Sequence, residues 1–123
     1  MKIYTTSRDD YLKAILVLQK KLGMVRSVDI ARYLGVSKPS VCRAVSTLTQ
    51  NGYLYMSDDF FLHLTDAGMS IAQSTYERHC FFTRYLVGIG VDTATAEEDA
   101  CKLEHAISEV SFQKLKATLS PAK

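Results

Sequence analysis

Residues 27–54 read "SVDIARYLGVSKPSVCRAVSTLTQNGYL", and this stretch decides how the chain folds. Apolar residues recur every three or four positions on both sides of Gly35, which predicts two short amphipathic helices joined by the turn "GVS". Ser27 is placed to cap the first helix, and Pro39 falls in the first turn of the second, where its missing N–H costs nothing. The residues expected to face inward are Ile30, Ala31, Leu34, Val41, Ala44, Val45 and Leu48. The pattern predicts a helix-turn-helix.

The next segment, residues 53–65, reads "YLYMSDDFFLHLT" and alternates in polarity around an acidic turn at Asp58 and Asp59. This alternation predicts a two-stranded hairpin. A helix-turn-helix followed by a hairpin is a winged helix. The acidic turn argues against a strong phosphate grip from the hairpin, so most of any affinity for DNA should come from basic residues elsewhere.

An amphipathic helix is also predicted in front of the motif, over residues 7–22. Its opening "SRDD" fits a capping box formed by Ser7 and Asp10, and Gly23 stands where a helix would end. Its inward face is expected to contain Tyr11, Leu12, Ile15, Leu16 and Leu22.

Helices also fill the second half of the chain. A long helix is predicted to run from residue 65 through "DAGMSIAQSTYERHCFFTRYLVGIG", Asp92 offers a cap for another through Ile107, and a last one covers residues 108–119. The predicted fold class is therefore mainly α with a small β-hairpin.

Two domains are predicted: a winged helix-turn-helix DNA-binding domain over residues 1–64 and a helical domain over residues 65–123. At 123 residues with 47% hydrophobic content, the chain is long enough for one ordinary domain or two small ones sharing a core. No stretch approaches the roughly 20 apolar residues that span a bilayer, and the N-terminus lacks the apolar core of a secretory signal. These features predict a cytoplasmic protein without a membrane partner.

The charges are distributed unevenly, although the formal net charge is only +2. The first 64 residues carry nine Lys and Arg against five acids, whereas the remainder carries six against eight. A basic front half suggests a polyanionic partner, and an acidic back half can collect cations. Three cysteines without disulfide-scaffold spacing are expected to be thiols, ligands or core residues.

The second helix of the motif has the side chains of a DNA reader. It contains no acid, and its exposed start offers Ser37, Lys38, Pro39, Ser40 and Arg43. Such groups contact phosphates and base edges when a helix enters the major groove by its N-terminal turn, and Arg43 can chelate a guanine. The alternative is a helical hairpin with a solvated basic face. We predict that double-stranded operator DNA is the partner.

A second cluster of functional groups is "CKLEH", residues 101–105. On a continuous helix, Glu97, Cys101, Glu104 and His105 form a polar stripe beside an apolar one. These groups would border the core and need partners, which one divalent cation can provide if other helices complete its shell. The apolar stripe contains Ala100, Leu103, Ile107 and Val110.

His79 on the long helix and Asp10 on the first helix are candidates to complete this shell. Other interpretations remain open at this point: Asp10 as a capping carboxylate only, His79 as a surface histidine, Cys101 as a small core residue and Glu104 as a solvated acid.

Three alternative functions also remain open. The chain could be an enzyme with Cys101 as nucleophile and His105 as base, but it has neither a Gly-rich oxyanion loop nor a convincing third group. We therefore predict no catalytic residue and no organic cofactor. The others are a winged-helix module that binds protein and a thiol-sensing or metal-independent regulator.

Five segments together resemble the diphtheria-toxin-repressor family of metal-dependent transcriptional regulators. They are "DDYLKAILVL", the helix-turn-helix, "LTDAG", "RHCFFTRYLVGIGVD" and "EDACKLEHAIS", which follow in order and with matching spacing over nearly the whole chain. The resemblance implies a DNA-binding winged helix, a helical metal-binding and dimerisation domain that forms a homodimer, and transition metal bound between the two. It also implies the short two-domain, MntR-like form, because the chain ends where that second domain ends.

The resemblance further implies that Asp10, Cys101, Glu104 and His105 are primary metal ligands and that His79 occupies a ligand position. The manganese branch of the family has an aspartate at the position of Asp10, whereas the iron branch has a cysteine at the position of Cys101. This hybrid set implies Mn²⁺ or Fe²⁺ and leaves Zn²⁺ and Co²⁺ open.

Two departures from the family pattern affect the number of metal ions. Lys13 stands where the manganese branch has another carboxylate ligand, and Thr83 replaces a glutamate of the iron branch's ancillary site, where Glu97 could contribute beside His79. We predict one well-made metal site, with or without a weaker second. The predicted function is a metal-dependent transcriptional regulator, by resemblance a repressor, that binds DNA as a dimer and controls metal homeostasis.

Overall fold

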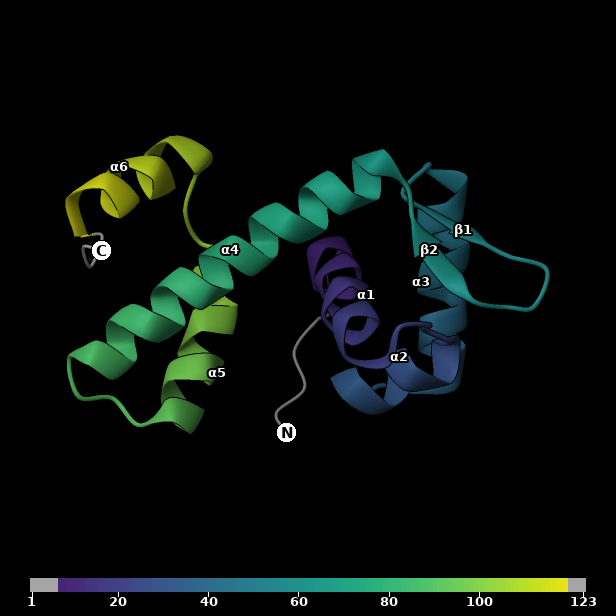
Figure 1. Ribbon diagram of the computed structural model, residues 1–123, viewed down its shortest axis with the longest axis horizontal. Helices are drawn as coiled ribbons and strands as arrows, with labels where there is room; N and C mark the ends of the chain where they lie inside the picture. Colours follow the sequence, from purple (N-terminus) through teal and green to yellow (C-terminus); the bar gives the residue numbers. More distant parts are fainter. Residues whose placement is uncertain (1–6, 120–123) are drawn as a thin grey trace. The chain divides into compact units, whose positions relative to one another are not determined.

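The computed structural model describes residues 7–119 (Figure 1). The fold is mainly helical with one antiparallel hairpin, which confirms the predicted fold class. Residues 1–6, part of the N-terminus in which no secretory signal was found, lie outside the described residues. The elements are α1 (Arg8–Leu22), α2 (Ser27–Leu34), α3 (Lys38–Gln50), β1 (Leu54–Met56), β2 (Leu62–Leu64), α4 (Asp66–Gly88), α5 (Thr93–Leu103) and α6 (Glu109–Leu119).

The chain forms two compact units that meet within α4. The first unit ends at Gln73 and the second begins at Ser74. The domain boundary predicted after residue 64 lies just before α4, and it stays a prediction. Within residues 7–119, no helix combines the length and apolar character needed to cross a membrane.

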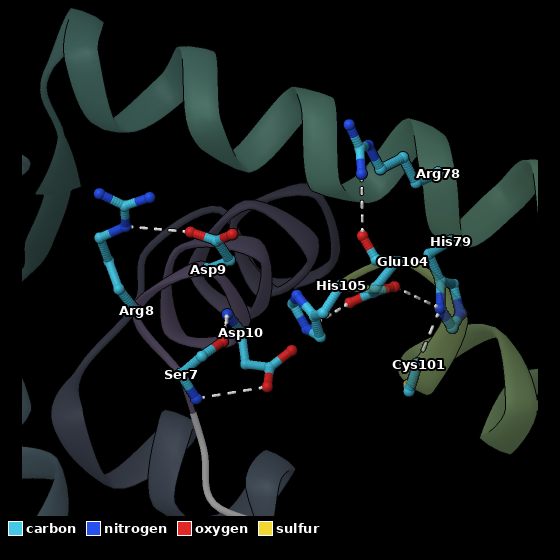
Figure 2. A network of polar contacts seen from close by, with 9 residues as sticks. All are labelled: Ser7, Arg8, Asp9, Asp10, Arg78, His79, Cys101, Glu104 and His105. Atoms are coloured by element: carbon cyan, nitrogen blue, oxygen red, sulfur yellow. Dashed lines mark hydrogen bonds and ion pairs between the residues drawn. The ribbon is translucent and has the colours of Figure 1, made fainter. Parts of the chain in front are cut away.

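Helix α1 begins with the predicted capping box. The Asp10 N–H donates to Ser7 Oγ at 3.2 Å, and the Ser7 N–H donates to Asp10 Oδ2 at 3.4 Å (Figure 2). The expectation for Leu22 was wrong, because this last residue of the helix is 54% exposed. The buried stripe ends one turn earlier, at Leu18, since the elements packed on α1 cover it only that far.

Helices α2 and α3 form the predicted helix-turn-helix, and Gly35 adopts the left-handed conformation (φ 71°) at the end of α2. Ser27 is not the cap of α2, as predicted, but its first residue. The helix starts earlier because Asp29 Oδ2 reaches back and accepts a 2.9 Å hydrogen bond from the Arg26 N–H. Helix α3 begins as predicted, with Ser37 Oγ accepting a 3.3 Å hydrogen bond from the Ser40 N–H.

Strands β1 and β2 form the wing. Leu54 pairs with Leu64 and Met56 with Leu62, around the acidic turn that the sequence predicted. Val25, just before α2, makes a further antiparallel bridge to Leu62, which joins the wing to the helix-turn-helix. The first unit is therefore a winged helix. Its core contains Leu12, Ile15, Val25, Ile30, Val41, Val45, Leu48, Leu54 and Leu62.

The second unit has a core of its own made of phenylalanines from α4 and α6. Phe81 meets Phe82 and Phe112 edge to face, with ring centroids 5.3 and 5.5 Å apart. Ala100 of α5 is buried in the same cluster. Partly buried side chains packed against it are Leu103, Ile107, Leu115 and Leu119.

The helix predicted to run through Ile107 is shorter than expected. Helix α5 ends at Leu103, turns follow, and α6 starts as a separate helix at Glu109. Val110, which was predicted to continue the apolar stripe, is 71% exposed, because the break gives α6 its own orientation and Phe112 faces the core instead.

Candidate metal centre

Three predicted ligands come together within the second unit. His79 lies midway along α4, Cys101 lies in the last turn of α5, and Glu104 follows immediately after that helix. His79 Nδ1 is 3.1 Å from Glu104 Oε1 and 3.8 Å from Cys101 Sγ (Figure 2). One ligand atom from each residue lies within 4.8 Å of the others. Their convergence from positions 22 to 25 apart in the sequence is a property of the tertiary structure.

Glu104 is the central group of the cluster. Its side chain is 0% exposed, and it lies between two imidazoles, with Oε1 facing His79 and Oε2 at 3.3 Å from His105 Nε2. The alternative of a solvated helix acid is therefore wrong. A buried carboxylate is costly unless positive charge compensates it, and a cation held by the same groups would supply that charge.

The donor set fits a transition-metal ion. Atoms that each lie about 2.0–2.3 Å from a common ion are about 3–4 Å from one another, which is the spacing of the His79, Cys101 and Glu104 donors. Imidazole suits Fe²⁺ and Zn²⁺, thiolate favours softer ions, and carboxylate suits Mn²⁺. The combination fits a borderline divalent metal better than Ca²⁺ or Mg²⁺, which prefer oxygen ligands alone.

Asp10 and Glu97 are the other predicted ligands. Asp10 belongs to the first unit, where its capping role is observed, and its role as a ligand stays a prediction. Glu97 is exposed on α5, one turn before Cys101, and it too stays a prediction.

Of the two residues that depart from the family pattern, Lys13 is buried, and Thr83 is partly buried with a buried hydroxyl oxygen. Lys13 is buried in α1, one turn after Asp10. Among the described residues, Thr83 Oγ1 is one of two buried side-chain oxygens or nitrogens without a hydrogen-bond partner. Thr83 lies one turn after His79 on α4, so this part of the helix retains unused hydrogen-bonding capacity.

Sequence reasoning missed Arg78, the neighbour of His79. Its guanidinium donates to the Glu104 carbonyl at 3.2 Å, to the Ile107 carbonyl at 2.6 Å and to Glu109 Oε1 at 2.8 Å. In Figure 2, Arg78 and His79 of α4 hold opposite ends of Glu104. Nothing in the local pattern indicates this role, because the partners lie 26 to 31 positions further along the chain.

The predicted DNA-contacting residues lie together at the start of α3. Ser37 Oγ donates to Ser40 Oγ at 2.9 Å, and the Arg43 guanidinium lies 3.5 Å from the same oxygen. Ser37, Lys38, Pro39 and Arg43 are exposed. The arrangement leaves a compact polar and basic surface at one end of the helix.

Comparison with known proteins matches both halves of the chain to one family. Residues 4–59 match the iron dependent repressor N-terminal DNA binding domain, and residues 65–123 match the iron dependent repressor metal binding and dimerisation domain. The HTH-type transcriptional regulator MntR of Lysinibacillus sphaericus is 32% identical over 111 residues, which cover 90% of this chain and 80% of the relative. The chain belongs to the iron-dependent repressor family. This confirms the resemblance seen in the sequence.

Some proteins similar to this chain are longer than it. The transcriptional regulator MntR of Escherichia coli O157:H7 is 37% identical over 101 residues, which cover 82% of this chain and 65% of the relative. The structure of the manganese regulator SloR superposes with a TM-score of 0.85 at 27% identity, and the match covers 98% of this chain and 56% of SloR. The chain thus spans between half and two thirds of the length of these relatives.

Family membership also bears on the enzyme alternative. The matched family models describe a DNA-binding domain and a metal-binding and dimerisation domain, and the relatives with a named role are transcriptional regulators.

Proposed function

We propose that this chain is a metal-dependent transcriptional repressor that binds operator DNA as a homodimer when loaded with Mn²⁺ or Fe²⁺ and thereby controls metal homeostasis. The observation that carries the proposal is the buried Glu104 carboxylate, surrounded by His79, Cys101 and His105. Family domains for DNA binding and for metal binding and dimerisation support it. Related structures include a manganese-dependent repressor in complex with manganese and ScaR with bound Zn²⁺.

His79, Cys101, Glu104 and His105 would hold the metal within the second unit, and Asp10 would complete the ligand set from the first. The bound ion would supply the positive charge that compensates the Glu104 carboxylate. The hard oxygen donors favour Mn²⁺ or Fe²⁺, whereas the Cys101 thiolate favours Fe²⁺, Co²⁺ or Zn²⁺. Glu97 would contribute only to a weaker second site.

Thermodynamic linkage would convert metal binding into DNA binding. A metal held by Asp10 and by the second unit restricts the arrangement of the two units. In a two-fold dimer, that arrangement sets the separation of the paired α3 helices, which must match half-sites about one duplex turn apart. Metal must then bind more tightly when DNA is present, by a coupling of about 1–3 kcal/mol, or roughly 5- to 150-fold.

The deciding experiment compares the wild-type protein with His105→Ala in a fluorescence-anisotropy titration. The duplex is the region upstream of the protein's own gene, and Mn²⁺, Fe²⁺ and Zn²⁺ are each added or omitted. We expect metal to increase the affinity of the wild type and not of His105→Ala, because the variant lacks one imidazole ligand while its helices remain folded. Glu98→Gln, an exposed change on α5, is the control and should respond like the wild type. Metal-stimulated binding that His105→Ala leaves unchanged would refute the proposal.

Calorimetric titration tests the number of metal sites. Because Lys13 cannot ligate while protonated, we expect one equivalent of Mn²⁺ to bind with the dominant affinity. Two equivalents bound with similar affinity would contradict the single-site version.

A thiol-sensing regulator is the second candidate, and the 3.8 Å separation of Cys101 Sγ from His79 Nδ1 favours it over a metal-independent module. Metal analysis of the purified protein separates the two. A thiol sensor would contain no stoichiometric metal and would lose DNA binding on treatment with a mild oxidant.

A protein-binding module would show no salt-dependent association with any duplex.

A further inference from the structure

Between α5 and α6, the carbonyl groups of Glu104 and Ile107 lack the intrahelical hydrogen bonds that a continuous helix would give them. In a continuous α-helix, each of these carbonyls would accept a hydrogen bond from the N–H four residues further on. Here the carbonyls of Glu104 and Ile107 both accept hydrogen bonds from Arg78 Nη1, at 3.2 and 2.6 Å. A side chain of α4 therefore stabilises the break.

Arg78 is itself held firmly. Its Nη2 donates to Glu109 Oε1 at 2.8 Å, its guanidinium lies 5.2 Å from the centre of the Phe112 ring, and its side chain is only 12% exposed. A guanidinium presents its donors in one planar fork, so two carbonyls and a carboxylate can fix its position. The pKa of Glu109 is lowered first of all by this hydrogen bond and then by one from Gln113, which is consistent with a formed ion pair.

The same turn carries two of the proposed metal ligands. Glu104 is held at its carbonyl by Arg78 and at its carboxylate by His79, which are consecutive residues of α4. His105 follows directly. If the helix continued past Leu103, as the local pattern favours, each residue would advance by about 100° around its axis, and the two ligands would take other directions.

We propose that Arg78 is a positioning residue of the metal centre, which seals the break after α5 and so holds Glu104 and His105 in a preassembled ligand geometry. This inference rests on the proposed function, since it concerns the same metal site. Arg78 contacts no metal itself. Because Arg78 already holds the turn after α5 in place, the turn would not have to rearrange when metal binds. Because the same guanidinium contacts Glu109 and Phe112, it also links the ligand turn to α6.

The test uses Co²⁺ as a spectroscopic probe with four variants of the full chain. Arg78→Met removes all the hydrogen bonds, and Arg78→Lys keeps the charge without the fork. Glu109→Gln removes only the negative charge of this ion pair, because the amide oxygen can still accept a hydrogen bond from Arg78. Glu77→Gln is the matched control, because it breaks another α4–α6 ion pair, with Lys116, and does not touch the turn.

We expect Arg78→Met to weaken Co²⁺ binding about 10- to 100-fold, the usual effect of losing a group that orients metal ligands. Arg78→Lys should recover part of this loss, and both should change the visible Co²⁺ absorption, which reports ligand geometry. Glu109→Gln should have a smaller effect and Glu77→Gln almost none. In the metal-free protein, hydrogen exchange of amides 104–107 should be faster in Arg78→Met.

The results separate this inference from the proposed function. If the wild type binds no metal, both fail. If the wild type binds metal while folded Arg78→Met keeps its affinity within about twofold and its absorption spectrum, only the role of Arg78 is overturned. Should Arg78→Met fail to fold, Arg78→Lys decides, and wild-type affinity and spectrum in that variant overturn the inference.

Discussion

Helices α3 and α5 carry the two candidate functional regions, and they differ in what determines their ends. Helix α3 starts where Ser37 caps it, with Pro39 in its first turn as the sequence predicted, and it ends at Gln50. Helix α5 also starts at its predicted cap, because Asp92 accepts a 3.0 Å hydrogen bond from the Thr95 N–H. However, α5 ends at Leu103 and does not run through Ile107 as predicted. The comparison shows that helix ends are predictable where their partners are local and unpredictable where, as with Arg78, a partner lies on a distant helix.

The same contrast distinguishes the two units. The residues predicted to contact DNA lie close together in the sequence, within residues 37–43 at the start of α3. The candidate metal centre of the second unit combines residues of α4, of α5 and of the turn after it, and these elements pack around the phenylalanine core. Changes to that core should therefore affect the metal centre much more than the winged helix.

The largest expected effect comes from Phe112→Ala. Phe112 is 1% exposed, so the variant should destabilise the second unit by about 3–5 kcal/mol and abolish metal binding. Urea denaturation combined with hydrogen exchange measures each unit, and α1–α3 should keep their protection. Val110→Ala on the same helix is the control and should change stability by less than about 0.5 kcal/mol, because Val110 is exposed. Equal loss of amide protection in both units would show that Phe112 stabilises the winged helix as much as it stabilises the second unit.

Metal addition should have the next largest effect. At a free concentration 100 times Kd, bound metal stabilises the state that holds it by about 2.7 kcal/mol, and a chelator should reverse this. Hydrogen exchange should slow in the second unit, and in α1 as well if Asp10 is a ligand. Asp10→Asn separates the two roles of this residue, because an amide oxygen can still accept the Ser7 N–H. Slowing of α1 that persists in Asp10→Asn would exclude Asp10 as an essential ligand.

Gly68→Ala tests tight packing in the first unit. A Cβ at this position would lie 2.1 Å from the Tyr53 carbonyl oxygen, so the start of α4 or the loop before β1 must move. We expect a loss of about 1–3 kcal/mol in thermal or urea unfolding. Gly88→Ala, at the other end of α4, meets no atom within 4 Å and should cost nothing. Equal stability of the two variants would contradict the close approach.

The smallest effect concerns the titration of Glu109. Its pKa is lowered first by the Arg78 hydrogen bond, so NMR titration of Arg78→Met should find it raised toward the ordinary carboxyl value. The depressed pKa means that this interaction stabilises the fold above the ordinary pKa and that the stabilisation is lost as the pH falls through the folded value. Asp92 is the internal control, because its pKa is lowered by hydrogen bonds from Thr95 and should not change. An unchanged Glu109 pKa would show that the ion pair does not persist in solution.

Local signals in the sequence determined much of this protein. The capping box of Ser7 and Asp10, the turn at Gly35, the start of α3 and the alternation of the hairpin identify a winged helix, because each depends on partners within a few residues. The spacing within "CKLEH" also singled out the cluster as a candidate metal site. Residue types and short spacings were sufficient for the winged helix, whereas the predicted set of metal ligands also needed the resemblance to the family.

Only the tertiary structure decided where α5 ends, that Leu22 and Val110 are exposed, and that Glu104 is buried between two imidazoles. Each depends on which surfaces pack together, and the energies of such contacts are not encoded in local periodicity. The hydrogen bond from Arg78 to the Glu104 carbonyl spans 26 positions. This carbonyl, which a continuing helix would pair locally, is paired instead with a donor from α4, a helix distant in the sequence.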